Sequence, residues 1–242
     1  MNSQPGFDQC VSFIASQFLG SAEPAPSNKL AITISRQSGS GGHAVAEYLV
    51  RYMNVNAPGI QFPWMAFDRN LVEQVLEDHH LPTHLARLMP EDRISDLTDM
   101  LHQMFGIHPP FWTLVHQTSE TILRLATQGN VILIGRGANL VTNKVRHAFH
   151  VRLVGSLKKR IAHMQEIRGV DAKTALEIVQ MEDRGRQRYV KKYFNEEVEN
   201  PLIYDLVVNT DLMSYEETAR LIGDTVLHRA GTLTPQQARA VV

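Results

Sequence analysis

Apolar residues follow two alternating patterns along most of this chain. Short, mostly apolar runs that predict strands occur at residues 30–34, 130–135, 147–154 and 204–210. The run at 130–135 is continuous, as expected for a parallel strand buried on both faces of a sheet. Between these runs, apolar residues recur at helical spacing, as Val45, Leu49 and Met53 do. Strands that alternate with helices predict a three-layer α/β/α domain with a parallel central sheet.

The same periodicity divides the chain into regions. It predicts a short helix at residues 9–19, after which GSAEPAPSN breaks the pattern with prolines and small polar residues. We therefore expect residues 1–28 to form an N-terminal helix and linker, and residues 29–242 to form the main domain.

Inside the main domain, the helices predicted from periodicity lie at residues 67–76, 157–168 and 171–188. The last helix is expected to open with the capping box Ser214-x-x-Glu217. Residues 81–129 are rich in leucine, methionine and histidine, and their spacing is helical rather than alternating. This pattern predicts a helical insertion.

Composition and charge narrow the function classes. A chain of 242 residues that is 43% apolar can bury one large core, and the single cysteine, Cys10, excludes an internal disulfide and a zinc site of several cysteines. With 24 basic and 25 acidic residues, the net charge of −1 gives no reason to expect nucleic acid or a membrane as a partner. No window is apolar enough for a membrane span and no leader is recognisable, so we expect a cytoplasmic protein.

The stretch ITISRQSGSGGHAVAEYL passes from the first predicted strand through a glycine-rich turn into a helix. Glycines in such a turn let successive backbone N–H groups converge on an anion at a helix N-terminus. The candidate phosphate-binding residues are Gly39, Ser40, Gly41 and Gly42. In the common pattern G-x-x-x-x-G-K-[ST], the lysine falls at Gly42 and the first glycine at Arg36, so the match is partial and a plain tight turn is the alternative.

Two further clusters carry positive charge. The run EDRGRQRYVKKYF places Arg184 and Arg188 on one face of a predicted helix, where a row of cations suits phosphates. The run IGRGANLV ends a buried strand in Gly-Arg-Gly and places Arg136 at the edge of the sheet where ligands bind in open α/β domains. The alternatives are a solvated helix face and an ordinary strand-to-loop turn.

Taken together, these clusters resemble the cytidylate kinase-like family, a branch of the P-loop nucleoside monophosphate kinases. The similarity covers about residues 30–229 and rests on six stretches in register: ITISRQSGSGG, FDRNLVEQV, GNVILIGRGANLV, HVRLVGSLKKRI, EDRGRQRYVKKYF and YDLVVNT. It implies a P-loop kinase fold with a helical acceptor-binding insertion at about 67–129 and a basic lid at about 181–195. The implied reaction is transfer of the γ-phosphoryl group of Mg²⁺-bound ATP to a nucleoside monophosphate, with CMP or dCMP as the name-giving acceptors.

The resemblance also implies roles for single residues. On the donor side, the residues that would cradle the phosphates of ATP are Gly39, Ser40 and Gly41, with Gly42 and His43 beside them. On the acceptor side, Arg136 matches an arginine used toward the acceptor phosphate, and Asp68 matches an aspartate at the start of the acceptor segment. The lid arginines are matched by Arg184 and Arg188.

ATP and Mg²⁺ are the implied cofactors, and the chain shows no metal site of its own. The group His79, His80 and His84 has helical spacing, but Pro82 interrupts it, so we expect no metal there. A small-molecule substrate is the partner that we expect. Self-association is left open.

Several residues depart from the pattern of authentic cytidylate kinases. The P-loop lysine is replaced by Gly42, which is a feature of this branch, and Arg36, His43 or a lid arginine is expected to supply its charge. The aspartate that helps to read cytosine is replaced by Gly137. Two alternatives therefore stay open: a nucleotide-binding sensor without turnover, and a kinase that acts on another small molecule.

Overall fold

A computed structural model of the chain describes residues 30–57, 63–68, 110–135 and 137–232. Its centre is a five-stranded sheet in the order β2-β3-β1-β4-β5, in which every neighbouring pair is parallel. The strands are β1 (Ala31–Arg36), β2 (Met65–Phe67), β3 (Val131–Ile134), β4 (Ala148–Val154) and β5 (Leu206–Asn209). Since β1 is the central strand, the loop that follows it leaves from the middle of the edge where parallel sheets bind ligands.

Helices connect the strands. They are α2 (Gly42–Asn56), α6 (Pro110–Gln128), α7 (Ala138–Val141), α8 (Leu157–Arg168), α9 (Ala172–Phe194) and α10 (Tyr215–Thr232), with a 3₁₀ turn at Pro201–Ile203. Side chains define where two of them begin: the Ser156 hydroxyl accepts from an N–H of α8, and the Asp171 carboxylate accepts from two N–H groups of α9.

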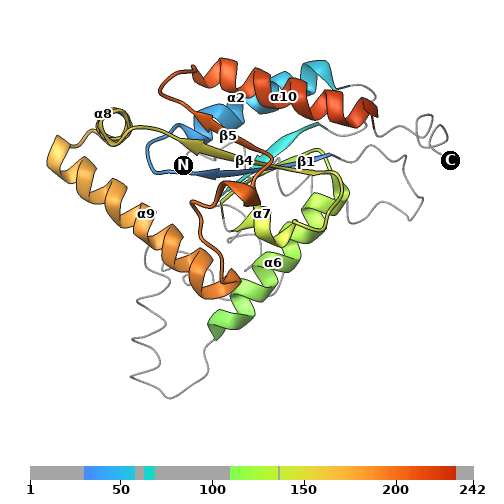
Figure 1. The fold of residues 1–242 in the computed structure, drawn as a ribbon, viewed down its shortest axis with the longest axis horizontal. Coiled ribbons are helices and arrows are strands. Elements are labelled where there is room, and N and C mark those ends of the chain that lie inside the picture. The colour runs from blue at the N-terminus through green and yellow to red at the C-terminus, as the bar shows by residue number, and fades with distance from the viewer. Residues whose placement is uncertain (1–29, 58–62, 69–109, 136, 233–242) are drawn as a thin grey trace, which may run out of the picture.

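The helices cover both faces of the sheet and make three layers (Figure 1). Helices α2 and α10 lie on one face, over a hydrophobic cluster that includes Ile32, Leu153 and Ile222. On the other face, α6 packs on a second cluster that includes Leu125 and Leu133. The alternation of side chains along each strand produces these two clusters, because successive residues point to opposite faces.

Part of the second face is polar and buried. The register of β1 and β4 places Thr33 opposite His150 and Ser35 opposite Arg152. The Thr33 hydroxyl lies 2.9 Å from Nδ1 of His150, and Arg152, which is 4% exposed, donates from Nη1 to the Ser35 hydroxyl at 2.9 Å. Burial lowers the pKa of His150, because the charged imidazolium is disfavoured away from water.

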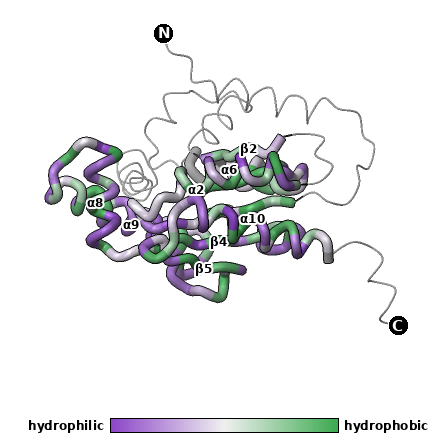
Figure 2. The backbone as a smooth tube through the Cα atoms, turned by 90° about the horizontal axis from the view of Figure 1, so that it is seen from above, coloured by the Kyte–Doolittle hydropathy of each residue, from purple (hydrophilic) through white to green (hydrophobic). Residues whose placement is uncertain are grey.

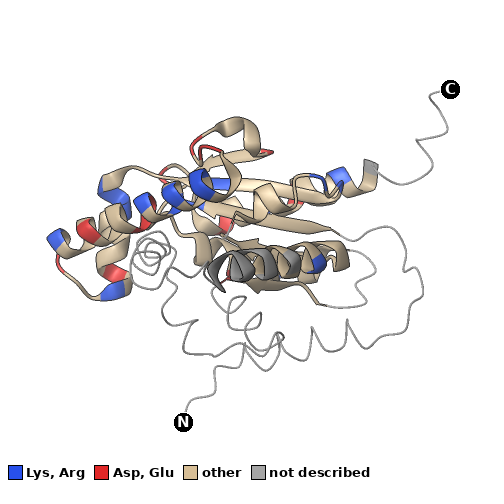
Figure 3. Ribbon diagram, turned by 90° about the horizontal axis from the view of Figure 1, so that it is seen from below, with Lys and Arg blue, Asp and Glu red and all other residues tan. Residues whose placement is uncertain are grey.

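Helices α8 and α9 form an arm at one side of the sheet, and Figure 3 shows lysine, arginine, aspartate and glutamate gathered along it. Green and purple residues interleave along both helices in Figure 2, as expected for helices with one apolar face. The apolar face of each helix meets the other in a small cluster of Met164, Ala175 and Val179. Among the described helices, none combines the length and apolar character of a membrane span.

The predicted fold class is confirmed, and each predicted strand is present within two residues of its expected ends. The capping box of α10 is also present: the N–H and hydroxyl of Ser214 donate to Glu217, whose own N–H donates back to the Ser214 hydroxyl. The predicted start of a helix at Phe67 is wrong, because Phe67 is the last residue of β2 and pairs with Leu133.

Other sequence predictions lie outside the described residues. These are the helix at 9–19, the rest of the helix at 67–76 and the histidine group around His80. The boundaries at residues 28 and 29, the acceptor-binding insertion and the lid therefore stay predictions. The segment predicted as the lid coincides with the C-terminal half of α9, which runs without a break to Phe194.

Candidate active site

The glycine-rich loop joins the end of β1 directly to α2. Gly39 and Gly41 have φ angles of +79° and +82°, in the left-handed region that favours glycine. A Cβ at Gly39 would lie 2.4 Å from the carbonyl oxygen of Arg160, and one at Gly41 would lie 2.2 Å from the Tyr215 ring. Both positions therefore require glycine. Because the first turn of α2 carries no acidic side chain, its N-terminus favours an anion.

Buried polar contacts hold the loop in this shape. The Ser40 hydroxyl donates to the carbonyl oxygen of Gln37 at 2.8 Å, and the N–H of Gly155 donates to the Gln37 side chain at 3.0 Å. Ser40 is 1% exposed. Its side chain therefore stabilises the turn from inside the protein.

Arg36 lies beside the position where the common pattern carries its lysine. A Cβ at Gly42 would lie 3.0 Å from Cγ of Arg36, so the arginine side chain runs along this glycine. The Arg36 guanidinium lies 3.6 Å from the Asp68 carboxylate, and His43 contacts the same carboxylate through Nε2. The side chains of Arg36 and Asp68 are 12% and 18% exposed, so they bring a largely buried ion pair to the loop.

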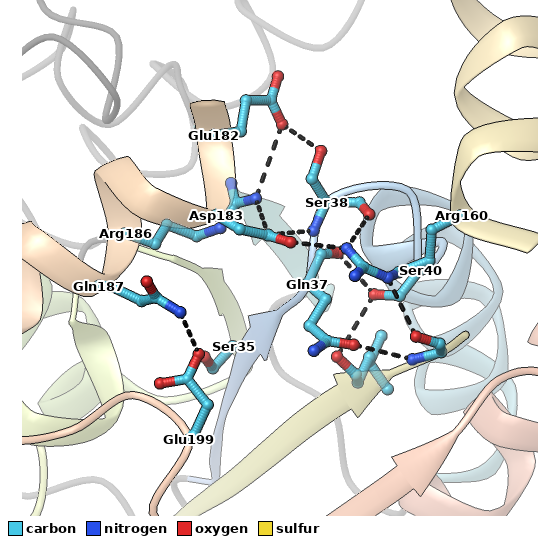
Figure 4. Close-up of polar contacts among 12 residues, drawn as sticks. Ser35, Gln37, Ser38, Ser40, Arg160, Glu182, Asp183, Arg186, Gln187 and Glu199 are labelled. Carbon is cyan, nitrogen blue, oxygen red and sulfur yellow. Dashed lines mark hydrogen bonds and ion pairs between the residues drawn. The ribbon is translucent and has the colours of Figure 1, made fainter. Parts of the chain in front are cut away.

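Two carboxylates of α9 contact the loop at Ser38 (Figure 4). The Ser38 N–H donates to Oδ1 of Asp183 at 2.7 Å, and the Ser38 hydroxyl donates to Oε2 of Glu182 at 2.5 Å. Asp183 also accepts from Arg160 at 2.6 Å and from Arg186 at 2.8 Å. Asp183 thus joins α8, α9 and the loop in one network, as Figure 4 shows.

Arg160 is the buried centre of this network. Its side chain donates to the carbonyl oxygens of Gly155 and Ser38, both at 3.0 Å, as well as to Asp183. The residue is 8% exposed. Since a buried guanidinium is tolerated only when its donors are satisfied, these bonds fix α8 against the loop.

A cavity of about 680 Å³ lies in front of the loop. Its charged lining residues balance in sign: Arg36, Arg168 and Arg186 are basic, and Glu47, Asp68 and Glu182 are acidic. The loop contributes Gln37, Ser38, Gly39, Gly41, Gly42 and His43. The arrangement offers backbone N–H groups, a helix N-terminus and arginines to one bound anion.

A second cavity, of about 740 Å³, lies on the other side of Gly39. His163 lines both cavities, and its Nδ1 lies 2.9 Å from the carbonyl oxygen of Gly39 and 3.2 Å from the Tyr215 hydroxyl. The rings of His163 and Tyr215 are 5.4 Å apart and tilted by 48°. Burial raises the pKa of Tyr215, so its hydroxyl stays protonated at neutral pH.

The structure places most of the predicted site residues together and leaves three aside. The first cavity is lined by six of them: Arg36, Gly39, Gly41, Gly42, His43 and Asp68. One of the three left aside is Ser40, which is buried inside the loop and is not among the described residues that line the two cavities. The side chains of Arg184 and Arg188 are exposed, and neither is among the described residues that line the two cavities. Arg136 lies outside the described residues, so its role stays a prediction.

Sequence reasoning missed three residues of the network: Arg160, Asp183 and Arg186. A signal was available for one pair, because Asp183 and Arg186 are three residues apart and therefore neighbours on a helix. The partner of Arg160 could not be read from the sequence, because Asp183 is 23 residues further along and on another helix.

A sequence profile of the cytidylate kinase-like family matches residues 31–212 of this chain, which include the loop, Asp68 and the α8–α9 arm. The chain belongs to the cytidylate kinase-like family. The resemblance read from the sequence is thereby confirmed. A cytidylate kinase-like chain is expected to be a P-loop protein, and the glycine loop between the central strand and α2 agrees with this.

Two known proteins are similar to this cytidylate kinase-like chain. A crystal structure of an uncharacterized protein from Eubacterium ventriosum is 18% identical, covers 82% of this chain and 98% of its own, and superposes with a TM-score of 0.60, which shows the shared fold. A uronate isomerase from Corynebacterium glutamicum is 30% identical over 112 residues, which are 46% of this chain and 21% of that protein. The chain thus spans about a fifth of the length of this curated relative.

The site fits ATP better than it fits a metal ion by itself. The left-handed glycines, the start of α2 without an acidic side chain and the arginines of the first cavity suit a polyphosphate. Within the described residues, no group of three or more histidine, cysteine, aspartate or glutamate side chains could hold a metal ion. Mg²⁺ usually binds through one or two carboxylates together with the phosphates of a nucleotide, so this site would take it together with ATP.

Proposed function

We propose that this protein transfers the γ-phosphoryl group of ATP to a small acceptor, and that the acceptor is a nucleoside monophosphate of the CMP or dCMP type. The observation that carries the proposal is the first cavity. There, the glycine loop, the start of α2 and three arginines face one space of about 680 Å³ at the ligand-binding edge of a parallel sheet.

The second cavity supports ATP as the donor. Gly39 and His163 line both cavities, so we propose that a ligand that extends past the loop enters both. The tilted rings of His163 and Tyr215 offer an aromatic edge to a base. We assign the base of the donor to this second cavity and its phosphates to the loop.

Positioning and charge neutralisation carry the proposed catalysis. The loop N–H groups hold the donor phosphates, and Arg36 and Arg186 neutralise charge on the transferring group. Mg²⁺, when bound, supplies further neutralisation across the phosphate oxygens. Asp68 and Arg136 orient the acceptor. Arg184 and Arg188 are proposed to act only after closure of the lid.

One observation favours a different acceptor. Gly137 occupies the position of the aspartate that helps to read cytosine, and it has a φ of +66°. A Cβ there would lie 2.6 Å from the Phe194 ring, so an acidic side chain has no room unless that ring or α9 moves. This supports a kinase for another small molecule as the second candidate function.

The test is ADP release by purified protein with ATP and Mg²⁺ across a panel of nucleoside monophosphates and small phosphorylatable alcohols. Turnover with CMP or dCMP supports the first candidate, and turnover only with another compound supports the second. If the protein binds ATP but phosphorylates no compound of the panel, it acts as a nucleotide sensor, and the proposed phosphoryl transfer is wrong.

A further inference from the structure

A carboxylate occupies the phosphate-binding cavity from within the chain. Oε2 of Glu182 accepts from the Ser38 hydroxyl at 2.5 Å and lies 3.7 Å from Nη2 of Arg186. Oε1 of the same carboxylate lies 3.9 Å from Nη2 of Arg168. Glu182 therefore sits among one loop hydroxyl and two guanidinium groups, all of which line the first cavity.

These are the groups that a phosphate oxygen would use. Hydroxyl donors and arginines bind phosphate and carboxylate by the same charge-assisted hydrogen bonds, so the two anions compete for them. Two anions at one place also repel each other strongly where water is partly excluded. A phosphate that enters beside Ser38 must therefore displace the Glu182 carboxylate or be excluded by it.

We infer that Glu182 is an internal counter-anion that holds Ser38, Arg168 and Arg186 while no nucleotide is bound, and that a phosphate group of the substrate displaces it. The inference rests on the proposed function, because it concerns the phosphates of that same reaction. Glu182 thereby sets the affinity of the site for phosphate compounds.

The neighbouring Asp183 does not take part in this exchange. Its three bonds, to Ser38, Arg160 and Arg186, are 2.6 to 2.8 Å long, whereas the two arginine contacts of Glu182 are 3.7 and 3.9 Å long. Asp183 is also not among the residues that line the cavity. Three short bonds keep Asp183 as the fixed tie between α9 and the loop. Glu182 lines the cavity and has one short bond, to Ser38, beside its two longer arginine contacts, which leaves it as the group that exchanges.

The exchange links phosphate binding to the α8–α9 arm. Arg168 is the last residue of α8, and Arg186 lies in α9. When phosphate replaces Glu182, both arginines gain a doubly charged partner in the cavity in place of a singly charged one. The released carboxylate is free to turn to solvent, since its side chain is 27% exposed in the structure.

The experiment compares binding of inorganic pyrophosphate and of ATP by isothermal titration calorimetry in the wild type, Glu182→Gln and Glu177→Gln. Glutamine keeps the shape of residue 182 and can still accept from Ser38, but it removes the negative charge. Glu177 is an exposed residue of the same helix, so its variant makes the same change in net charge away from the cavity. We expect Kd for both ligands to fall about tenfold in Glu182→Gln and to change less than about twofold in Glu177→Gln.

Equal or weaker binding by Glu182→Gln, with ATP still bound by the wild type, would overturn the exchange and leave the proposed function standing. If none of the three proteins binds ATP or pyrophosphate, both the proposed function and the exchange are contradicted. Glu182→Ala is the second variant in case the glutamine variant does not fold. It also lacks the charge, so the same gain in affinity is expected.

Discussion

Arg36 and Gly42 fit together as a pair at the start of the site. The arginine side chain runs along the glycine, and a Cβ at residue 42 would already lie 3.0 Å from Cγ of Arg36. A lysine at this position would have to displace the arginine. In the proposed function, Arg36 supplies a cation to the phosphates from the strand side, where the common pattern supplies it from the helix side.

We predict that Arg36→Met lowers kcat/KM for phosphoryl transfer by about 100- to 1000-fold, the usual effect of losing one preorganised charged donor. Arg36→Lys should recover part of this loss, because it restores the charge without the guanidinium geometry. Steady-state kinetics with ATP and the best acceptor of the panel measures both. Arg220→Met is the matched control, since Arg220 is exposed on α10 and pairs only loosely with Glu216 at 3.8 Å.

A rate for Arg36→Met within about threefold of the wild type would contradict this role. In that case another cation of the cavity, such as Arg186, would have to complete the loop. Thermal denaturation of each variant separates a loss of catalysis from a loss of folding, because Arg36→Met also leaves Asp68 without one of its partners.

The arginines of α9 show that the sequence alone could not predict which face of this helix lies against the loop. The density of the basic run predicted a phosphate site on this helix and selected Arg184 and Arg188, which share an exposed face. Arg186 lies between them in sequence and is buried at the cavity, because Ser38 and Asp183 draw that face of α9 onto the loop. Ser38 is 145 residues from Asp183, so no local pattern could have fixed the face.

At the scale of elements, strands β1, β3 and β4 could be predicted because they are buried on both sides. The runs that became β1, β3 and β4 are continuous, and they are apolar apart from the pairs Thr33–His150 and Ser35–Arg152, which we call the polar ladder. Such runs are the pattern that parallel strands require. Strand β2 could not be predicted, because three residues are too few to show a period. Helix α9 runs six residues past its predicted end at Arg188, because Tyr189 and Val190 are buried and continue its apolar face.

The polar ladder between β1 and β4 predicts a pH dependence of stability. The pKa of His150 is lowered by burial, with Arg229 adding to the effect and Asp205 opposing it. Below a pH of about 6.5 the unfolded chain binds a proton that the folded chain does not, so the free energy of unfolding falls as the pH drops. For this one group the slope is at most about 1.4 kcal/mol per pH unit.

Urea denaturation at pH 7.5 and 5.5 measures this dependence. In His150→Gln the loss of stability between the two pH values should be smaller than in the wild type. The control is His228→Gln, a change at an exposed residue of α10, which should lose as much stability between the two pH values as the wild type does. An identical loss in all three proteins would show that His150 does not titrate differently on unfolding.

At the scale of the whole molecule, the loop and both cavities join separate parts of the chain. The lining comes from β1, α2, α8, α9, the β5–α10 connection and the start of α10. A ligand that bridges these elements binds only the folded state, and so it stabilises the whole domain.

We therefore predict that ATP at about 100 times its Kd raises the free energy of unfolding by about 2.7 kcal/mol. For a chain of this length this corresponds to a rise in Tm of about 5 to 10 °C. Differential scanning fluorimetry with ATP, pyrophosphate and adenosine measures it. Adenosine should give the smallest shift, because it lacks the groups that bind the loop, and an equal shift with adenosine would contradict phosphate binding there.

The position of β1 in the sheet has a consequence for biosynthesis. The strand is made before its two partners, β3 and β4, which follow it by roughly a hundred residues. At about 5 to 20 residues per second, the ribosome needs on the order of ten seconds to deliver these partners. Throughout that interval the apolar segment Ala-Ile-Thr-Ile has no partner strand, so the nascent chain has to be protected from aggregation until its C-terminal half emerges.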